Sequence, residues 1–252
     1  MTSRHRKKIM KSYDTHKYDL HDAVVKMLNR ADSNMVGTWE KQQQRSPPDK
    51  EELLLQEFRV AVPSLNRSAF GGQCENAQRY LSDHIASDTE FLSAFDTFVR
   101  GVVLPWLKDK LIECQMVGNS TDECKFYYQR PPTLRLQPGP SRAYVKAHAD
   151  SDYGHQDGEL NFWIPLVNLE QAGKTYLHVE SEPNKGDYHP IVSTYGDVVS
   201  FHGSFCRHFV PANASNNTRI SLDFRIGLDK YFDTKWQMIG TTADHARCEV
   251  TY

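Results

Sequence analysis

The period of the apolar residues changes near Phe126, and this change constrains the fold of the 252-residue chain more than any other feature. Before it, apolar residues recur at helical spacing, as in the series Phe91, Phe95, Phe98, Val99, Val102 and Trp106. After it, residues 133–137 alternate between polar and apolar side chains, which is the period of a strand. The sequence therefore predicts helices first and strands second.

Five strand-like runs follow residue 140, and clusters of Gly, Pro, Asn and Asp, which favour turns, separate them. They are residues 143–148, 160–166, 175–180, 198–202 and 219–226. Because no helical pattern lies between them, the expected arrangement is a barrel or a sandwich. The predicted fold class is α+β, with helices mainly from the N-terminal half and a β-barrel after them.

The length fits a single domain, and we interpret residues 1–252 in this way. Its expected parts are a basic N-terminal extension with one helix at 1–50, helical support at 51–125, a barrel core at 126–228 and a tail at 229–252. The extension carries 11 Lys and Arg against 6 Asp and Glu. Its helix is predicted from an apolar stripe formed by Leu20, Val24, Val25 and Leu28.

Two local signals mark the long helix expected after residue 87. Ser87-Asp88-Thr89-Glu90 has the form of a capping box, in which the Ser87 hydroxyl and the Glu90 carboxylate satisfy free amide groups. Pro105 cannot donate a backbone hydrogen bond, so the helix is predicted to bend or restart there.

Composition excludes several classes of protein. The net charge of -2 gives no electrostatic reason to expect binding to nucleic acid or to an anionic membrane. No apolar run approaches the roughly 18 residues of a membrane-spanning helix, and the N-terminus lacks the apolar core of a signal peptide. The 5 cysteines are odd in number and show no CxxC spacing, which speaks against a zinc site or a redox pair. We therefore expect a cytoplasmic protein that acts on a small molecule.

The 11 histidines are the chemically informative residues. His148 and Asp150 stand two apart at the end of a predicted strand, so their side chains point the same way and can reach one ion. His208 follows 58 residues after Asp150, just beyond another predicted strand. Two histidines and one carboxylate on one face of a metal form the facial triad of non-haem Fe(II) oxygenases.

A second pair of residues follows this set on the last predicted strand. Arg219 and Ser221 come 11 and 13 residues after His208 and share one strand face. A guanidinium group beside a hydroxyl group suits the far carboxylate of a buried dicarboxylate.

The ordered set of HxD, a distal His and RxS resembles the Fe(II)/2-oxoglutarate-dependent dioxygenases. Residues 126–228 are closer still to the streptomycin-biosynthesis-type hydroxylases, which are relatives of the phytanoyl-CoA and ectoine hydroxylases; the similarity runs through PTLRLQPG, AHADSDYGHQDGELNFWIPL, YLHVESEP, GDVVSFHGSFCRH and TRISLDFRI. The resemblance implies a double-stranded β-helix, the jelly-roll or cupin-like barrel, within a single catalytic domain.

The same resemblance implies the cofactors and their ligands. His148, Asp150 and His208 would bind Fe(II), while Arg219 and Ser221 would bind the C5 carboxylate of 2-oxoglutarate. O2 would be the second co-substrate, with ascorbate as a possible reductant. Related halogenases have Ala or Gly in place of the carboxylate, so the presence of Asp150 favours hydroxylation.

Rival ligands exist. His155 and Asp157 form a second HxD, but they lie in a loop between two glycines, whereas the first pair ends a strand. His202 competes with His208, although the spacing from His208 to Arg219 fits the family better. His148, Asp150 and His208 are therefore the preferred ligand set, with His155, Asp157 and His202 as the alternatives.

Further site residues are expected around this set. Arg135 and Asn161 are candidates for second contacts to the co-substrate. The candidates for substrate contacts are Asp152, Tyr153, His155 and Arg225, with Glu180 and Ser181 near the mouth. Because these surroundings are polar, a small polar metabolite such as an amino acid or a natural-product intermediate fits better than an acyl chain.

Two other classes of function fit the sequence less well. A metal-dependent cupin-type enzyme that does not use 2-oxoglutarate would not need the Arg219 and Ser221 anchor. A non-catalytic small-molecule-binding barrel would not need an intact triad. The sequence gives no indication of the oligomeric state.

Overall fold

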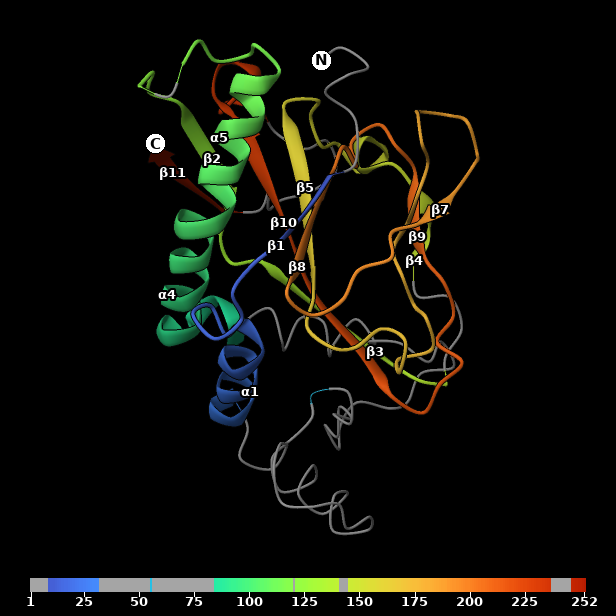
Figure 1. Cartoon of the computed structure of the whole chain (residues 1–252). Helices are drawn as coiled ribbons and strands as arrows, with labels where there is room; N and C mark the ends of the chain where they lie inside the picture. The colour runs from blue at the N-terminus through green and yellow to red at the C-terminus, as the bar shows by residue number, and fades with distance from the viewer. Residues whose placement is uncertain (1–8, 32–54, 56–83, 120, 141–144, 237–245) are drawn as a thin grey trace.

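Figure 1 shows the computed structural model of the chain, which describes residues 9–31, 55, 84–119, 121–140, 145–236 and 246–252. Helices lie on one side of a large antiparallel sheet, and a smaller antiparallel sheet lies on its other side (Figure 1). The predicted order of helices first and strands second is confirmed for the main elements. Of the expected helical support, residues 51–54 and 56–83 lie outside the described residues.

The helices are α1 (Leu20–Ala31), α4 (Thr89–Phe98), the π-helix η3 (Val99–Val103) and α5 (Leu104–Glu113). The large sheet has the order β1-β8-β5-β10-β2-β11, and β3 also pairs with β10. Its strands are β1 (Ile9–Ser12), β2 (Lys125–Gln129), β3 (Thr133–Pro138), β5 (Glu159–Pro165), β8 (Asp197–Phe201), β10 (Thr218–Leu228) and β11 (Arg247–Thr251).

The small sheet has the order β4-β9-β6-β7. Its strands are β4 (Val145–His148), β6 (His178–Val179), β7 (His189–Pro190) and β9 (His208–Val210). The 3₁₀ turns η4 (Asp150–Tyr153) and η5 (Asp229–Tyr231) follow β4 and β10 respectively. Two antiparallel sheets of this kind fit a jelly roll. Among the described residues, however, no hydrogen-bonded strand pair joins the two sheets into the closed barrel that we expected.

Most predicted strands are present. The runs at 160–166, 198–202 and 219–226 correspond to β5, β8 and β10, and β4 covers the described part of the run at 143–148. The run at 175–180 forms only the two-residue strand β6. Two edge strands come from segments that we expected outside the barrel, since β1 pairs with β8 and β11 pairs with β2. These segments become strands because they pair with β8 and β2, and not because their own sequences alternate between polar and apolar residues.

Strand β10 lies at the centre of the large sheet, where it pairs with β2, β3 and β5. On the face toward the helices, its Phe224 ring meets Phe95 of α4 edge-on at a centroid distance of 5.1 Å and stacks on Phe162 of β5 at 5.3 Å. Trp106 of α5 contacts Phe162 from the same side. The aromatic stripe predicted on the helix is therefore a packing face, and it leaves the opposite face of β10 for polar residues.

The start of α4 differs in one respect from the capping box that we predicted. Asp88, not Ser87, is the N-cap residue, and its carboxylate accepts a hydrogen bond from the Phe91 amide at 2.8 Å. The Ser87 hydroxyl instead donates to the backbone of His84. Arg30 of α1 donates to the same Asp88 carboxylate, so the cap also ties α1 to α4.

Pro105 lies in the first turn of α5, directly after a π-helical turn in which the regular i→i−4 hydrogen bonds are already interrupted. The π-helical turn η3 precedes it and separates α4 from α5. Val103 and Leu104 both have αR backbone angles, so the helix runs on through Pro105 and does not restart there; the irregularity lies in the π-helical turn before it. Among the described helices, none is long and apolar enough to span a membrane.

We expect Asp88→Ala to lower the free energy of unfolding by about 1 to 2 kcal/mol, because it removes the N-cap and the partner of Arg30. Urea denaturation measures this loss. Ser87→Ala is the matched control and should cost less than about 0.5 kcal/mol. Equal losses for the two variants would contradict the assignment of Asp88 as the cap.

Candidate metal centre

Two histidines far apart in the sequence meet because their strands pair. In the antiparallel register of β4 with β9, His148 lies directly opposite His208. The ring centroids are 4.4 Å apart. Since directly opposite residues of an antiparallel pair project to the same face, the register alone brings the two imidazoles together.

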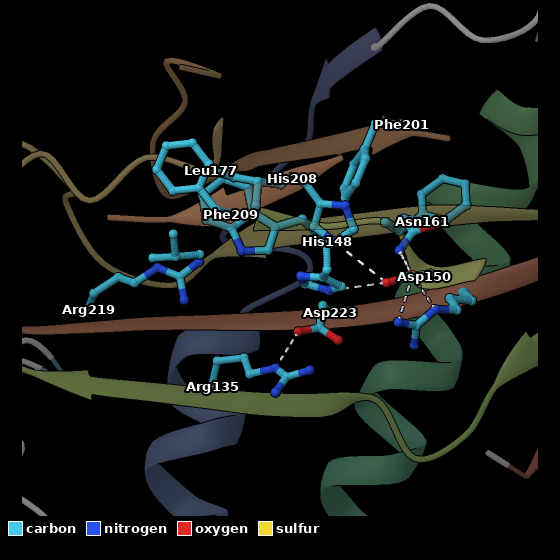
Figure 2. Close-up of a pocket in the computed structure, with 14 residues that line it drawn as sticks. Arg135, His148, Asp150, Asn161, Leu177, Phe201, His208, Phe209, Arg219 and Asp223 are labelled. Carbon is cyan, nitrogen blue, oxygen red and sulfur yellow. Dashed lines mark hydrogen bonds and ion pairs between the residues drawn. The ribbon is translucent and has the colours of Figure 1, made fainter. Parts of the chain in front are cut away.

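Asp150 completes the group from the turn after β4. Its Oδ1 atom lies 3.4 Å from Nε2 of His148 and 3.5 Å from Nε2 of His208. One ligand atom from each of the three residues lies within 4.8 Å of the others. Figure 2 shows the two imidazoles and the carboxylate turned toward one point. The three side chains that we predicted as iron ligands are thus brought together.

Backbone carbonyl groups fix the orientation of both imidazoles. Nδ1 of His148 donates to the Lys146 carbonyl at 2.8 Å, and Nδ1 of His208 donates to the Cys206 carbonyl at 3.1 Å. A carbonyl oxygen can only accept, so the proton of each neutral ring is on Nδ1. Each Nε2 therefore presents its lone pair toward Asp150, as a metal ligand requires.

The second carboxylate oxygen of Asp150 is bound from the large sheet. Its Oδ2 accepts hydrogen bonds from Asn161 Nδ2 at 2.7 Å and from Arg225 Nε at 2.8 Å, and Arg225 Nη2 lies 2.7 Å away. Gly203 makes room for this contact, because a Cβ atom there would lie 2.6 Å from the Asn161 amide carbon. These bonds leave Oδ1 directed toward the two imidazoles.

The protonation states suit a cation. Burial alone would raise the pKa of Asp150, but Arg225, the two imidazoles and Asn161 outweigh it, so this pKa lies well below its ordinary value. Burial lowers the pKa of His208. Burial also opposes protonation of His148, but its hydrogen bond to Asp150 raises that pKa overall. An ionised carboxylate and neutral imidazoles are the forms that bind a metal, so an ion would displace a proton at His148.

The rival ligands bind elsewhere. Nδ1 of His155 lies 2.9 Å from the Glu159 carboxylate, which also accepts a hydrogen bond from Arg247 at 2.6 Å. Nε2 of His202 lies 3.0 Å from the backbone oxygen of Asp157. Among the described residues, the metal-ligand geometry includes neither His155 nor His202.

One face of β10 carries the polar residues of the neighbouring pocket. This face is opposite the one that bears Phe224, and every second residue of the strand contributes to it: Arg219, Ser221, Asp223 and Arg225. Arg219 is buried, and its guanidinium carbon lies 5.3 Å from the centre of the Trp163 ring. Two buried polar atoms nearby, Ser221 Oγ and Trp163 Nε1, have no hydrogen-bond partner among the described residues.

Buried polar groups without partners are costly, and several of them close together suggest the place of a polar ligand. The far carboxylate of 2-oxoglutarate fits this place, because it could accept hydrogen bonds from Arg219, Ser221 and Trp163 at once. The side chains present are therefore compatible with the co-substrate that the sequence predicts.

Some predicted site residues line this pocket and others do not. The lining residues are Arg135, His148, Asp150, Asn161, Phe162, Trp163, Leu177, Phe201, His208, Phe209, Val210, Arg219, Asp223 and Arg225. Asp152, Tyr153 and His155, which we predicted as substrate contacts, are absent from this lining. Tyr153 is 60% exposed and meets the edge of His148, while Asp152 lies 3.3 Å from Arg207.

The expected mouth residues also lie in other contacts. Buried Glu180 accepts hydrogen bonds from the backbone amides of Asn184, Gly186 and Arg207. The hydroxyl of Ser181 donates to Asp187 at 2.6 Å. Both residues therefore order the loop after β6.

One pocket residue was missed. Asp223 faces the pocket and accepts a hydrogen bond from Arg135 of β3 at 2.7 Å (Figure 2). The alternation along β10 could have indicated it, because Asp223 stands midway between Ser221 and Arg225.

Comparisons with known proteins give partial matches. The chain is 32% identical over 111 residues to streptomycin biosynthesis protein StrG of Streptomyces griseus, a match that covers 44% of this chain and 50% of that protein. The matched region thus spans about half the length of this curated relative. The match confirms the resemblance to streptomycin biosynthesis proteins. No family model matches the chain.

Solved structures show weaker similarity. The non-haem monooxygenase ThoJ in complex with nickel is 14% identical with a TM-score of 0.41, and the match covers 62% of this chain and 66% of that one. The epimerase SnoN, solved with Fe3+, alpha-ketoglutarate and nogalamycin RO, is 16% identical with a TM-score of 0.38 and covers 60% of this chain and 69% of that one. At this level of similarity, function must be inferred from the side chains of the site.

We expect Arg225→Gln to weaken metal binding about 10- to 100-fold, because Asp150 loses two of the contacts that orient it. Anaerobic titration with Co(II), followed by its absorption spectrum, measures the affinity. Arg130→Gln is the control, since Arg130 also binds a carboxylate, that of Asp96, but lies outside the pocket. An unchanged affinity in Arg225→Gln would show that Asp150 does not need this arginine.

Proposed function

We propose that the protein is an Fe(II)- and 2-oxoglutarate-dependent dioxygenase that oxidises, and most simply hydroxylates, a C–H bond of a small polar metabolite. The products from the co-substrate would be succinate and CO2. The observation that carries the proposal is the convergence of His148, Asp150 and His208 on one point that borders a pocket.

The donor set favours iron among the common metals. Two imidazoles and one carboxylate that occupy one face of an ion leave the other positions open, which is the pattern of non-haem Fe(II) oxygenases. A structural zinc site would have four protein ligands, which the described residues do not offer here. The open positions would accept 2-oxoglutarate, dioxygen or solvent.

The anchor for 2-oxoglutarate supports the same conclusion. Arg219 would pair with its far carboxylate, and Ser221 would donate a hydrogen bond beside it. Burial of Arg219, at 2% exposure, makes such a charge-assisted bond strong and specific. A metal-dependent cupin enzyme that does not use 2-oxoglutarate, which is the alternative function, would not need an anchor for a dicarboxylate at this place.

When bound, the iron and 2-oxoglutarate supply the activation of O2 and the oxidising equivalent. The side chains of this protein orient and shield that chemistry. Asn161 and Arg225 set the orientation of the Asp150 carboxylate, which contributes a negative charge. The two imidazoles keep their lone pairs on Nε2. Phe201, Leu177 and Val210 line the pocket with apolar surface that excludes water from the substrate.

Asp150 also bears on the outcome of the reaction. In the related halogenases, a small residue replaces the carboxylate and leaves room for chloride. Here the carboxylate is present and buried, at 1% exposure. We therefore propose oxidation, such as hydroxylation, rather than halogenation.

The roles of the other predicted residues change within this proposal. Asn161 and Arg225 act on the orientation of Asp150 rather than as direct contacts to co-substrate or substrate. Arg135 remains a candidate for contact with a ligand in the pocket. We propose that the whole chain works as one catalytic domain, in which β1 and β11 extend the large sheet.

Incubation with Fe(II), ascorbate and labelled 2-oxoglutarate tests the proposal through release of labelled succinate. We expect the wild type to release succinate slowly without substrate and His148→Ala to release none. Arg219→Ala should need an about 10- to 100-fold higher concentration of 2-oxoglutarate for half-maximal succinate release. His189→Ala is the control, because His189 is exposed and lies outside the pocket.

Two results would contradict the proposal. One is the absence of succinate together with tight Fe(II) binding in His148→Ala. The other is equal affinity for 2-oxoglutarate in the wild type and in Arg219→Ala, measured by the absorption of the anaerobic Fe(II)–2-oxoglutarate chelate.

A further inference from the structure

One ion pair in the pocket is not used by the iron or by 2-oxoglutarate. The charged lining residues are Arg135, Asp150, Arg219, Asp223 and Arg225. Arg225 is bound to Asp150, and Arg219 is assigned to the far carboxylate of the co-substrate. Arg135 and Asp223 remain, and they are bound to each other with 2.7 Å between Nε and Oδ2.

The Arg135–Asp223 pair is more exposed to the pocket than the Arg225–Asp150 pair. The side chains of Arg135 and Asp223 are 32% and 25% exposed, whereas those of Arg225 and Asp150 are 10% and 2% exposed. Figure 2 shows Asp223 below the two histidines, between Arg135 and Asp150. A molecule in the pocket can therefore reach both charges.

The rest of the remaining lining is apolar. Phe201, Leu177, Phe209 and Val210 offer no charged group, so the ion pair is the main polar feature left for a substrate among the described residues. Burial would raise the pKa of Asp223, but Arg135 and Arg225 outweigh it and lower that pKa, which keeps the carboxylate ionised. The pocket thus presents one negative and one positive charge side by side.

The charge of the ligand follows from this pairing. A ligand with only a cation or only an anion would compete for one member of the pair and leave the other without its partner in a partly buried place, which is costly. A ligand that carries both charges on neighbouring atoms gives each member a new partner. The ammonium and carboxylate groups of an α-amino acid lie on one carbon atom and match the adjacent protein charges.

We propose that the substrate carries an α-amino acid group, with its ammonium nitrogen bound to Asp223 and its carboxylate bound to Arg135. The side chain of the substrate then lies against the apolar side chains of Phe201, Leu177 and Val210, near the iron ligands. This inference rests on the proposed function for the oxidation, but it concerns binding and is tested as binding.

The test uses calorimetry on the anaerobic protein, with and without Fe(II) and 2-oxoglutarate. The probes are the common L-amino acids, each compared with its N-acetyl and carboxamide derivatives, which lose the positive or the negative charge. We expect at least one free amino acid to bind, and each derivative of it to bind about 10- to 100-fold more weakly.

Variants of the pair separate its two halves. Asp223→Asn should weaken binding of the free amino acid by about tenfold or more and remove the penalty for N-acetylation, and Asp223→Glu should restore part of the affinity. Arg135→Gln should remove the penalty for the carboxamide in the same way. The Tm of each variant shows whether it is folded.

Asp96→Asn is the matched control. The Arg130–Asp96 pair has side chains that are 36% and 26% exposed, close to the values of the pocket pair, but it lies outside the pocket. Its loss should leave amino acid binding unchanged.

The proposal is overturned if no free amino acid binds, if N-acetyl derivatives bind as well as the free forms, or if Asp223→Asn binds like the wild type. Failure of the proposed function looks different. In that case the Fe(II)–2-oxoglutarate chelate would not form, while calorimetry without the co-substrate would still report on the amino acid.

Discussion

The carboxylate of Asp150 is the interaction on which the rest of this structure depends. Its Oδ1 faces His148 and His208 of the small sheet, and its Oδ2 binds Asn161 of β5 and Arg225 of β10 in the large sheet. A buried anion is stable only when charges and hydrogen bonds compensate it. The two sheets must therefore keep their relative position, and the metal-ligand geometry is the result. Gly203 contributes by leaving space for Asn161 beside this carboxylate.

Much of the site could be predicted from the sequence because its signals are local or follow from strand pairing. His148 and Asp150 share a direction through their spacing, and the family spacing selected His208 over His202. The partners of the rival residues His155 and His202 could not be predicted, because both contacts depend on the path of the chain between β4 and β5. His155 binds Glu159, and His202 binds the backbone of Asp157.

The roles of Arg225 and Asn161 could not be predicted, because they depend on how two sheets face each other. The sequence predicts each residue as a contact to a small molecule, since each lies on the strand face that points toward the pocket. Only the packing of the sheets shows that both meet Asp150. The edge strands β1 and β11 were missed for a related reason, because pairing with β8 and β2 rather than their own sequence pattern makes them strands.

Strand β10 explains why the fold and the site cannot vary independently. Arg219, Asp223 and Arg225 line the pocket from one face of this strand, while Phe224 on the other face packs against Phe95 and Phe162. The side-chain period of a strand is two, so a shift of one residue in the register would exchange the two faces. Such a shift would bury the arginines under the helices and turn the aromatic residues toward the metal ligands. The apolar contacts that stabilise the large sheet therefore also fix the positions of Arg219, Ser221, Asp223 and Arg225. The packing of one face of β10 thus determines where the charges on its other face lie.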